Sequence, residues 1–191
     1  MRTSITAQQS SFFTKNGYIE FGGIDLDVEA LFQALKAGER DQWQHSPLVR
    51  NLLIKKLGPI ALVLAGKKML RLGADLKVSP EEKPQKMGAC TEFFSVQGLQ
   101  IGCIIAKETA QQAPSPIGLL PLPSQPGNVL FFRANLLLDW PHCPPADLYL
   151  ATFALPNAVY VENRKDPKTN DLKKQGYAFG DLLRNDTHPL F

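Results

Sequence analysis

The sequence has few of the residues that most often bind metal ions: three histidines and three cysteines among 191 residues. His45, His142 and His188 lie far apart, and none of them belongs to an H-x-x-x-H motif. A C-x-x-C pair is also absent, which excludes a structural zinc site made of clustered Cys and His ligands. Any metal site that uses histidine must therefore be assembled by the fold from distant segments.

The odd number of cysteines argues against a disulfide scaffold. Cys90, Cys103 and Cys143 are widely spaced, which is usual for reduced thiols inside cells. Residues 1–10 are polar and lack the apolar core of a secretory signal. The apolar stretch at 59–66 is too short to span a bilayer. We therefore expect a cytoplasmic protein with no membrane partner.

No strong charge excess is present either. The 21 Lys and Arg residues stand against 18 Asp and Glu residues, a net charge of +3. The basic residues form short, dispersed clusters, and no helix-turn-helix pattern accompanies them. A DNA-binding regulator is disfavoured on this basis, and nucleic acid is not an expected partner. The length and the 44% hydrophobic content fit one domain over residues 1–191.

Apolar spacing predicts helices in the first third of the chain and short strands after it. Leucines at helical spacing predict a helix over 46–57, which Gly58-Pro59 should end. The short apolar run at 60–64 fits either a further helical segment or a strand. The later pattern predicts strands at 69–78, 91–96, 99–107, 128–132, 147–155 and 158–162. Helices followed by many short strands with Pro and Gly turns favour an α+β protein with a β-sandwich or barrel core. Aromatic residues in the polar tail after 164 predict that the tail packs back on the domain.

Three segments, taken together and in this order, resemble one enzyme family. They are FFTKNGYI at 12–19, LQIGCIIAKE at 99–108 and PGNVLFF at 126–132. They resemble the phytanoyl-CoA-hydroxylase-like branch of the Fe(II)/2-oxoglutarate-dependent oxygenases. The whole chain also resembles an uncharacterised chlamydial protein family. The resemblance implies a double-stranded β-helix, a jelly-roll core with flanking N-terminal helices.

The same resemblance implies Fe(II) and 2-oxoglutarate as cofactors. In that family two histidines and one carboxylate bind the iron. The first two ligands stand as H-x-D/E, since alternate residues of a strand point to one face. This sequence has no such motif, and the chain reads Cys90-Thr91-Glu92 at that place. Where the second histidine is expected the chain reads 137–140, Leu-Leu-Asp-Trp, and His142 follows.

The candidate metal ligands are therefore Cys90, Glu92, Asp139 and His142. A thiolate and a carboxylate suit zinc or iron if a third ligand comes from Asp139 or His142. The alternative is that Cys90 is a buried strand residue, Glu92 is solvated and His142 fills a rigid loop. His188 lies three residues from the C-terminus, where fraying is usual, so we do not expect it to be a ligand.

The family also uses a basic residue to bind the distal carboxylate of 2-oxoglutarate. The predicted strand at 147–155 has none. Arg133, at the end of the 128–132 strand, is the candidate in its place, either pointing into the barrel or exposed at the strand end.

Two functions remain after this comparison. The first is a binding or regulatory protein that keeps a barrel pocket for a small molecule and lacks the iron chemistry. The second is an active non-haem iron oxygenase with an atypical metal site that uses Glu92, His142 and one further ligand.

Overall fold

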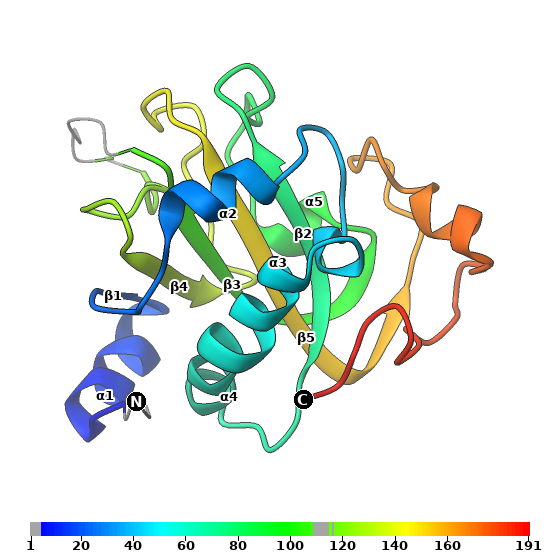
Figure 1. The fold of residues 1–191 in the computed structure, drawn as a ribbon, viewed down its shortest axis with the longest axis horizontal. Helices are drawn as coiled ribbons and strands as arrows, with labels where there is room; N and C mark the ends of the chain where they lie inside the picture. The colour runs from blue at the N-terminus through cyan, green and yellow to red at the C-terminus, as the bar shows by residue number, and fades with distance from the viewer. Residues whose placement is uncertain (1–4, 109–114, 116) are drawn as a thin grey trace.

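The computed structural model describes residues 5–108, 115 and 117–191. Five antiparallel strands form one sheet in the order β1-β4-β3-β5-β2 (Figure 1). The strands are β1 Tyr18–Phe21, β2 Arg71–Val78, β3 Val96–Ala106, β4 Val129–Arg133 and β5 Leu148–Tyr160. Helices and an antiparallel sheet in one structure confirm the predicted α+β class.

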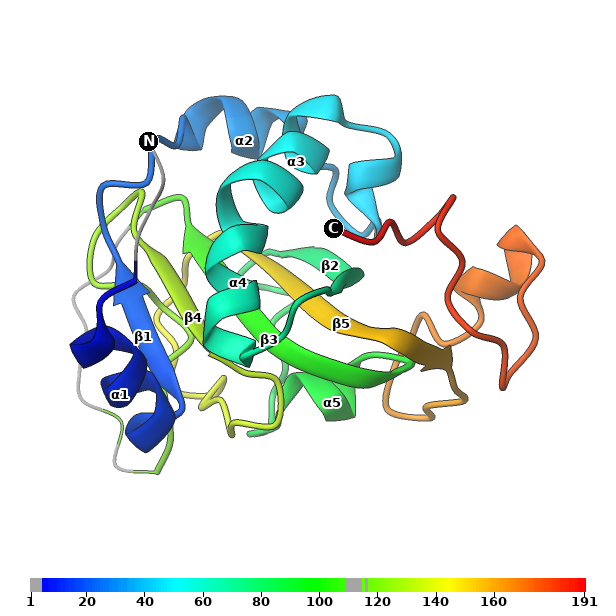
Figure 2. The ribbon, with the colours of Figure 1, turned by 90° about the horizontal axis from the view of Figure 1, so that it is seen from below.

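The N-terminal helices cover one face of this sheet. They are α1 Ala7–Asn16, α2 Val28–Ala34, α3 Pro47–Asn51 and α4 Gly58–Ala65, with the 3-10 turn η1 Gln42–Gln44 between α2 and α3. Figure 2 shows α2, α3 and α4 over this face, with the short α5, Cys90–Phe93, on the opposite side. The Thr6 side chain caps α1 by accepting from the backbone N–H of Gln9, and Gly17 ends it in the left-handed conformation.

The two faces of the sheet belong to two separate hydrophobic clusters, because successive strand residues point to opposite faces. In β4, Phe131 packs toward the helices, whereas Leu130 and Phe132 pack on the other side. The second cluster also contains buried side chains from irregular segments, including Phe94 and Trp140. Thus both faces are covered, one by helices and the other by loops.

The loops on the second face form a partial second layer rather than regular strands. Gly88 and Leu119 each form an isolated bridge with Leu138, and Ala134 accepts a hydrogen bond of 3.2 Å from the backbone N–H of Thr91. These contacts bring residues 88–91 next to residues 134–139. The segments in which the metal ligands were predicted are therefore neighbours in space.

The second helical segment is longer than predicted. Gly58-Pro59 does not end it, because the wide π turn η2, Leu52–Leu57, leads directly into α4. Pro59 lies in the first turn of α4, directly after the π turn, and this wider turn accommodates a residue that has no N–H to donate. A side chain at Gly58 would collide with the ring of Phe191 at 2.6 Å, so this glycine allows close packing rather than a stop.

Two predicted strand boundaries are wrong. Residues 91–96 do not form a strand, because Cys90–Phe93 is a single helical turn that buries Cys90 and Phe94 on the same side. The strands predicted at 147–155 and 158–162 are one strand, β5, which passes through Pro156. The pairing of β5 with β3 is irregular between Gln97 and Ile101, and such a bulge accommodates a residue that cannot donate to the ladder.

The C-terminal segment packs back on the domain, as predicted, and covers the outer edge of β2. Leu70 and Phe191 exchange two backbone hydrogen bonds of 3.0 and 3.2 Å, and Leu72 donates to Pro189. The fraying expected at His188 is wrong, because this side chain is fully buried. In the part of the chain that the structure describes, we find no helix long and apolar enough to cross a bilayer.

Candidate functional site

Cys90 and Glu92 occupy different environments. Cys90 is fully buried in the second cluster, where burial raises the pKa of its thiol far above the usual value. Glu92 is exposed, and its carboxylate lies 3.9 Å from Nζ of Lys165. The H-x-D/E spacing directs both ligands to one face only in a strand, whereas residues two apart in a helix differ by about 200°. The helical turn α5 therefore separates the side chains that the family pattern pairs.

Asp139 and His142 do meet. Nδ1 of His142 lies 2.9 Å from Oδ1 of Asp139, and the hydroxyl of Ser115 donates to Oδ2 of the same carboxylate. These two hydrogen bonds lower the pKa of Asp139, and the bond from Ser115 has the larger effect. The Asp139 side chain is fully buried, while that of His142 is 56% exposed. The carboxylate and the imidazole are therefore hydrogen-bonded to each other, and the imidazole is partly open to solvent.

Arg133 lies on the helix-covered side of the sheet rather than among the second cluster. Its side chain is exposed at the end of β4, and Nη2 donates a hydrogen bond of 2.9 Å to the carbonyl of Thr14 in α1. Its guanidinium lies 5.9 Å from the ring centre of Phe13. Together with Gln100 it lines a cavity of about 350 Å³ between α1, α4 and β3. Its predicted role in binding a cofactor stays a prediction.

The side chains present do not fit a non-haem Fe(II) centre. Such a centre needs two histidines and one carboxylate around one point. Among the described residues, no three His, Cys, Asp or Glu side chains converge in a way that could hold a metal ion. The resemblance implies a basic partner for 2-oxoglutarate in or after β5, and β5 itself contains neither Lys nor Arg.

Instead of polar ligands, bulky side chains fill the space between the sheet and the second layer. Phe94, Phe132, Trp140 and Tyr160 are each 2% exposed or less, and they belong to one cluster with Cys90. Leucine, alanine and valine side chains from β2, β3 and β5 complete this cluster. The space between the sheet and the loops of the second face is thus a packed apolar interior.

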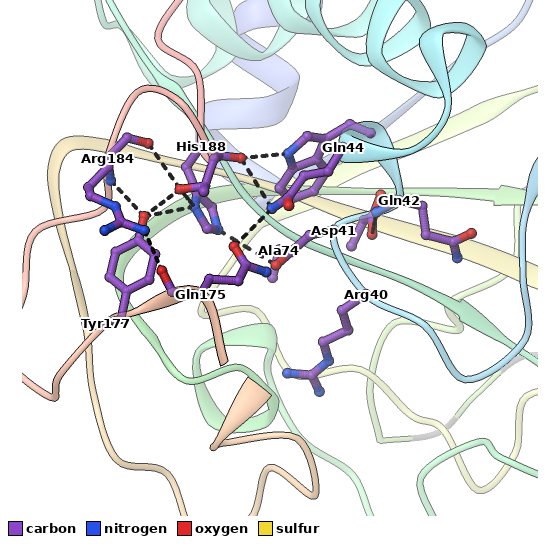
Figure 3. A network of polar contacts seen from close by, with 12 residues as sticks. Arg40, Asp41, Gln42, Gln44, Ala74, Gln175, Tyr177, Arg184 and His188 are labelled. Carbon is purple, nitrogen blue, oxygen red and sulfur yellow. Dashed lines mark hydrogen bonds and ion pairs between the residues drawn. The ribbon is translucent and has the colours of Figure 1, made fainter. Parts of the chain in front are cut away.

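A polar network that the sequence did not predict lies at the edge of β2 (Figure 3). His188 packs against Trp43, at 5.7 Å between ring centres, and against Tyr177, at 6.1 Å. Its Nδ1 lies 3.0 Å from Oγ1 of Thr187, and its Nε2 lies 3.8 Å from Oδ2 of Asp41. Burial, followed by the charge of Arg71, lowers the pKa of His188 to about 3, so the ring is neutral at neutral pH.

A buried ion pair connects this network to the tail. Nη1 of Arg40 donates a hydrogen bond of 2.6 Å to Oδ2 of Asp166, whose side chain is fully buried. The same oxygen accepts from the backbone N–H and the hydroxyl of Ser95 at 2.9 and 2.7 Å. The backbone N–H of Lys168 donates to the other oxygen at 2.8 Å. These bonds attach the tail to the start of β3.

Two neighbouring hollows, which share four lining residues, lie beside the ion pair. A small one of about 20 Å³ reaches Asp41 and His188, and an outer one of about 460 Å³ reaches the surface. Both are lined by Arg40, Asp41, Lys168 and Asp171. No spacing in the sequence predicts that the buried carboxyl group of Asp41 lies next to the buried imidazole of His188, so only the fold could show that they meet.

Comparison with solved structures identifies the fold. The carbocyclase SnoK from nogalamycin biosynthesis, described as non-heme and alpha-ketoglutarate-dependent, superposes with a TM-score of 0.69 at 16% identity over 98% of this chain and 96% of its own. The epimerase SnoN, solved with Fe3+ and alpha-ketoglutarate, gives 0.67 at 18% identity over 96% and 97%. This chain has the fold of the iron and 2-oxoglutarate-dependent oxygenases. The predicted jelly-roll class is thereby confirmed.

The predicted likeness to a chlamydial protein is also found. CT296 from Chlamydia trachomatis gives a TM-score of 0.55 at 18% identity, over 81% of this chain and 97% of its own. No protein-family model matches the sequence, and no curated protein matches it. Identities this low establish the shared fold alone, and the resemblance to the phytanoyl-CoA branch stays a prediction.

Proposed function

We propose that this protein is a non-catalytic binding protein that uses the fold of the iron and 2-oxoglutarate-dependent oxygenases. The observation that carries the proposal is the donor set. Cys90, which stands where the family has its first histidine, is a buried neutral thiol, and Glu92 is exposed. A thiol binds metal as the thiolate, and burial among apolar side chains opposes its ionisation.

The packed interior supports the same proposal. An oxygenase of this fold needs room beside the metal for 2-oxoglutarate, oxygen and a substrate. Trp140 and Phe132 are 1% and 0% exposed in that region. Admitting these molecules would require the removal of large side chains from a well-packed cluster, which costs several kcal/mol per residue.

One observation favours the alternative of an active oxygenase with an atypical site. His142 and Asp139 supply an imidazole and a carboxylate that already touch, on the side of the fold where the second histidine is expected. With one further ligand, this pair would make a three-ligand site of mixed type.

Calorimetric titration with Fe(II) under anaerobic conditions, followed by 2-oxoglutarate, separates the two functions. We expect no stoichiometric binding of either, and no release of succinate when oxygen is admitted. SnoN, solved with Fe3+ and alpha-ketoglutarate, is the positive control for binding. Tight 1:1 binding of both molecules, or succinate formation that His142→Ala and Glu92→Ala abolish, would overturn the proposal.

A further inference from the structure

The small hollow at the edge of β2 has the size of one non-hydrogen atom with its hydrogens. Its volume is about 20 Å³, and a cavity needs about 10–15 Å³ to hold one water-sized group. Asp41 and His188 approach each other across it, with 3.8 Å between Oδ2 and Nε2. This distance is too long for a direct hydrogen bond, and one donor atom placed between them can reach both.

His188 contributes an unpartnered nitrogen to this hollow. Its side chain is fully buried, and its Nε2 has no hydrogen-bond partner. The other nitrogen, Nδ1, is already occupied by Thr187 Oγ1 at 3.0 Å. When Nδ1 carries the proton, the neutral ring presents the Nε2 lone pair toward Asp41. A buried polar atom without a partner is costly, so a ligand that supplies a donor here is stabilised.

Asp41 contributes a carboxyl group that has no cation bound to it. Among the described residues, its one ion-pair contact is the neutral His188, and no N–H or O–H group donates to its carboxylate. The nearby guanidinium of Arg40 is committed to Asp166 at 2.6 Å. Burial, and then the charge of Asp75, raise the pKa of Asp41 well above its usual value. Burial thus favours the neutral acid while the hollow holds no cation, and a cationic group placed there would stabilise the charged carboxylate.

The outer hollow is lined by more positive than negative side chains. Lys36, Lys168 and Lys174 line it, against the carboxylates of Glu39 and Asp171. The Lys36–Glu39 pair, at 3.6 Å, joins two exposed side chains, and exposed Lys174 contacts half-buried Asp171 at 2.9 Å. Lys168 also contacts Asp171, at 4.0 Å. Ion pairs of this kind contribute about 1 kcal/mol or less, so these lysines can turn to a ligand at little cost. The mouth therefore offers one positive charge more than it needs for its own carboxylates.

We propose that this cleft binds a small zwitterionic amino carboxylate, with its ammonium group between Asp41 and His188 and its carboxylate among Lys36, Lys168 and Lys174. The proposal rests on the function proposed above, because it gives the binding protein its ligand class. An ammonium group can donate to both Oδ2 of Asp41 and Nε2 of His188 while it neutralises the carboxylate. A water molecule would fill the same space without stabilising the charged form of Asp41. The outer volume of about 460 Å³ suits a small molecule.

Titration calorimetry of the full chain with a series of ω-amino acids, from glycine to 6-aminohexanoate, tests this. The series varies the separation between ammonium and carboxylate while keeping both charges. We expect 1:1 binding by at least one member, and Asp41→Asn to weaken it by about tenfold or more, because a buried charge loses its partner. Asparagine tolerates the left-handed backbone of Asp41, at φ 55°, so the variant should fold. Asp27→Asn, the same change at the exposed cap of α2, is the matched control.

The mouth is tested with the double variant Lys168→Gln, Lys174→Gln, which we expect to weaken binding several-fold. Lys67→Gln, at another exposed lysine, should leave it within about twofold. Three results would overturn the proposal: no member binds at millimolar concentration, Asp41→Asn binds unchanged, or butylamine or butyrate binds as tightly as the best amino acid. Turnover of 2-oxoglutarate would instead refute the proposed function, and it would not depend on Asp41.

Discussion

The hydroxyl of Tyr149 in β5 donates a hydrogen bond of 2.6 Å to Oδ2 of Asp75 in β2, and both side chains are fully buried. The backbone N–H of Gln42 donates to the other oxygen at 2.9 Å. These bonds favour the carboxylate, but desolvation is the larger effect, and it raises the pKa of Asp75 to about 7. Asp75 therefore titrates near neutral pH.

The stability of the protein should consequently depend on Asp75 between about pH 4 and pH 7. In this window the folded chain keeps a proton that the unfolded chain has released, so the free energy of unfolding falls as the pH rises. The change from 3.8 to about 7 corresponds to about 4 kcal/mol. In Asp75→Asn this pH dependence should be absent. The difference in free energy of unfolding, variant minus wild type, should therefore increase by about 4 kcal/mol between pH 4 and pH 8. Urea unfolding at several pH values measures it, and parallel curves for the two proteins would contradict it.

His188 should produce the opposite dependence. Its folded pKa of about 3 lies below the usual 6.5, so the unfolded chain takes up a proton first, and stability is lost as the pH falls below about 6.5. We expect His188→Gln to be less stable than the wild type at pH 7, by about 1–3 kcal/mol, through lost packing against Trp43. At pH 4.5 this difference should shrink by about 2–3 kcal/mol. His45→Gln, at an exposed histidine, controls for loss of an imidazole, and a difference that stays constant with pH would exclude the buried neutral ring.

The Arg40–Asp166 pair should be important for attachment of the tail. Asp166→Ala leaves the Arg40 guanidinium and the groups of Ser95 without their acceptor. Loss of one partner of a buried pair costs about 3–5 kcal/mol. Thermal unfolding measures this loss, and limited proteolysis should cut the variant after residue 160 faster than the wild type. Asp186→Ala, which removes a pair at 3.7 Å between exposed side chains, should cost less than about 1 kcal/mol.

All three cysteines should resist thiol reagents in the native protein. Each is buried and free, and burial raises the pKa of Cys143 to about 11 and those of Cys90 and Cys103 further. The thiolate is the reactive form, so at pH 8 labelling should be about 100-fold slower than for a free thiol. Three thiols should react in denaturant. Rapid native labelling of Cys90 would show a reactive thiolate and would support a metal-binding role.

The sequence predicted the fold class because local signals in it are strong. The turn at Asn16-Gly17, the apolar run before Ala106 and the glycine at residue 127 all lie where the structure has an element boundary or a buried strand. The predicted boundaries of helices and strands are wrong where tertiary contacts override the local preference of the sequence. Gly58-Pro59 ends a helix in isolation, but a π turn before it and Phe191 beside it keep the helix continuous.

The candidate site was harder to predict, for a geometric reason. The pairing of Cys90 with Glu92 assumed a strand, and a single helical turn at this place directs them apart. Asp139 and His142 were predictable as neighbours because three residues separate them. Asp41 and His188 are 147 positions apart and meet only because both flank the edge of β2, which no spacing in the sequence reveals.

The segments that cover the edge of β2 also protect the protein against aggregation through this edge strand. An uncovered edge strand presents unpaired N–H and C=O groups that can pair with another chain and start aggregation. In this fold Arg40 pairs with Leu76, and the segment from Pro189 to Phe191 pairs with the start of β2 at Arg71 and Leu72. The tail thus keeps the sheet from growing by addition of a strand from a second molecule.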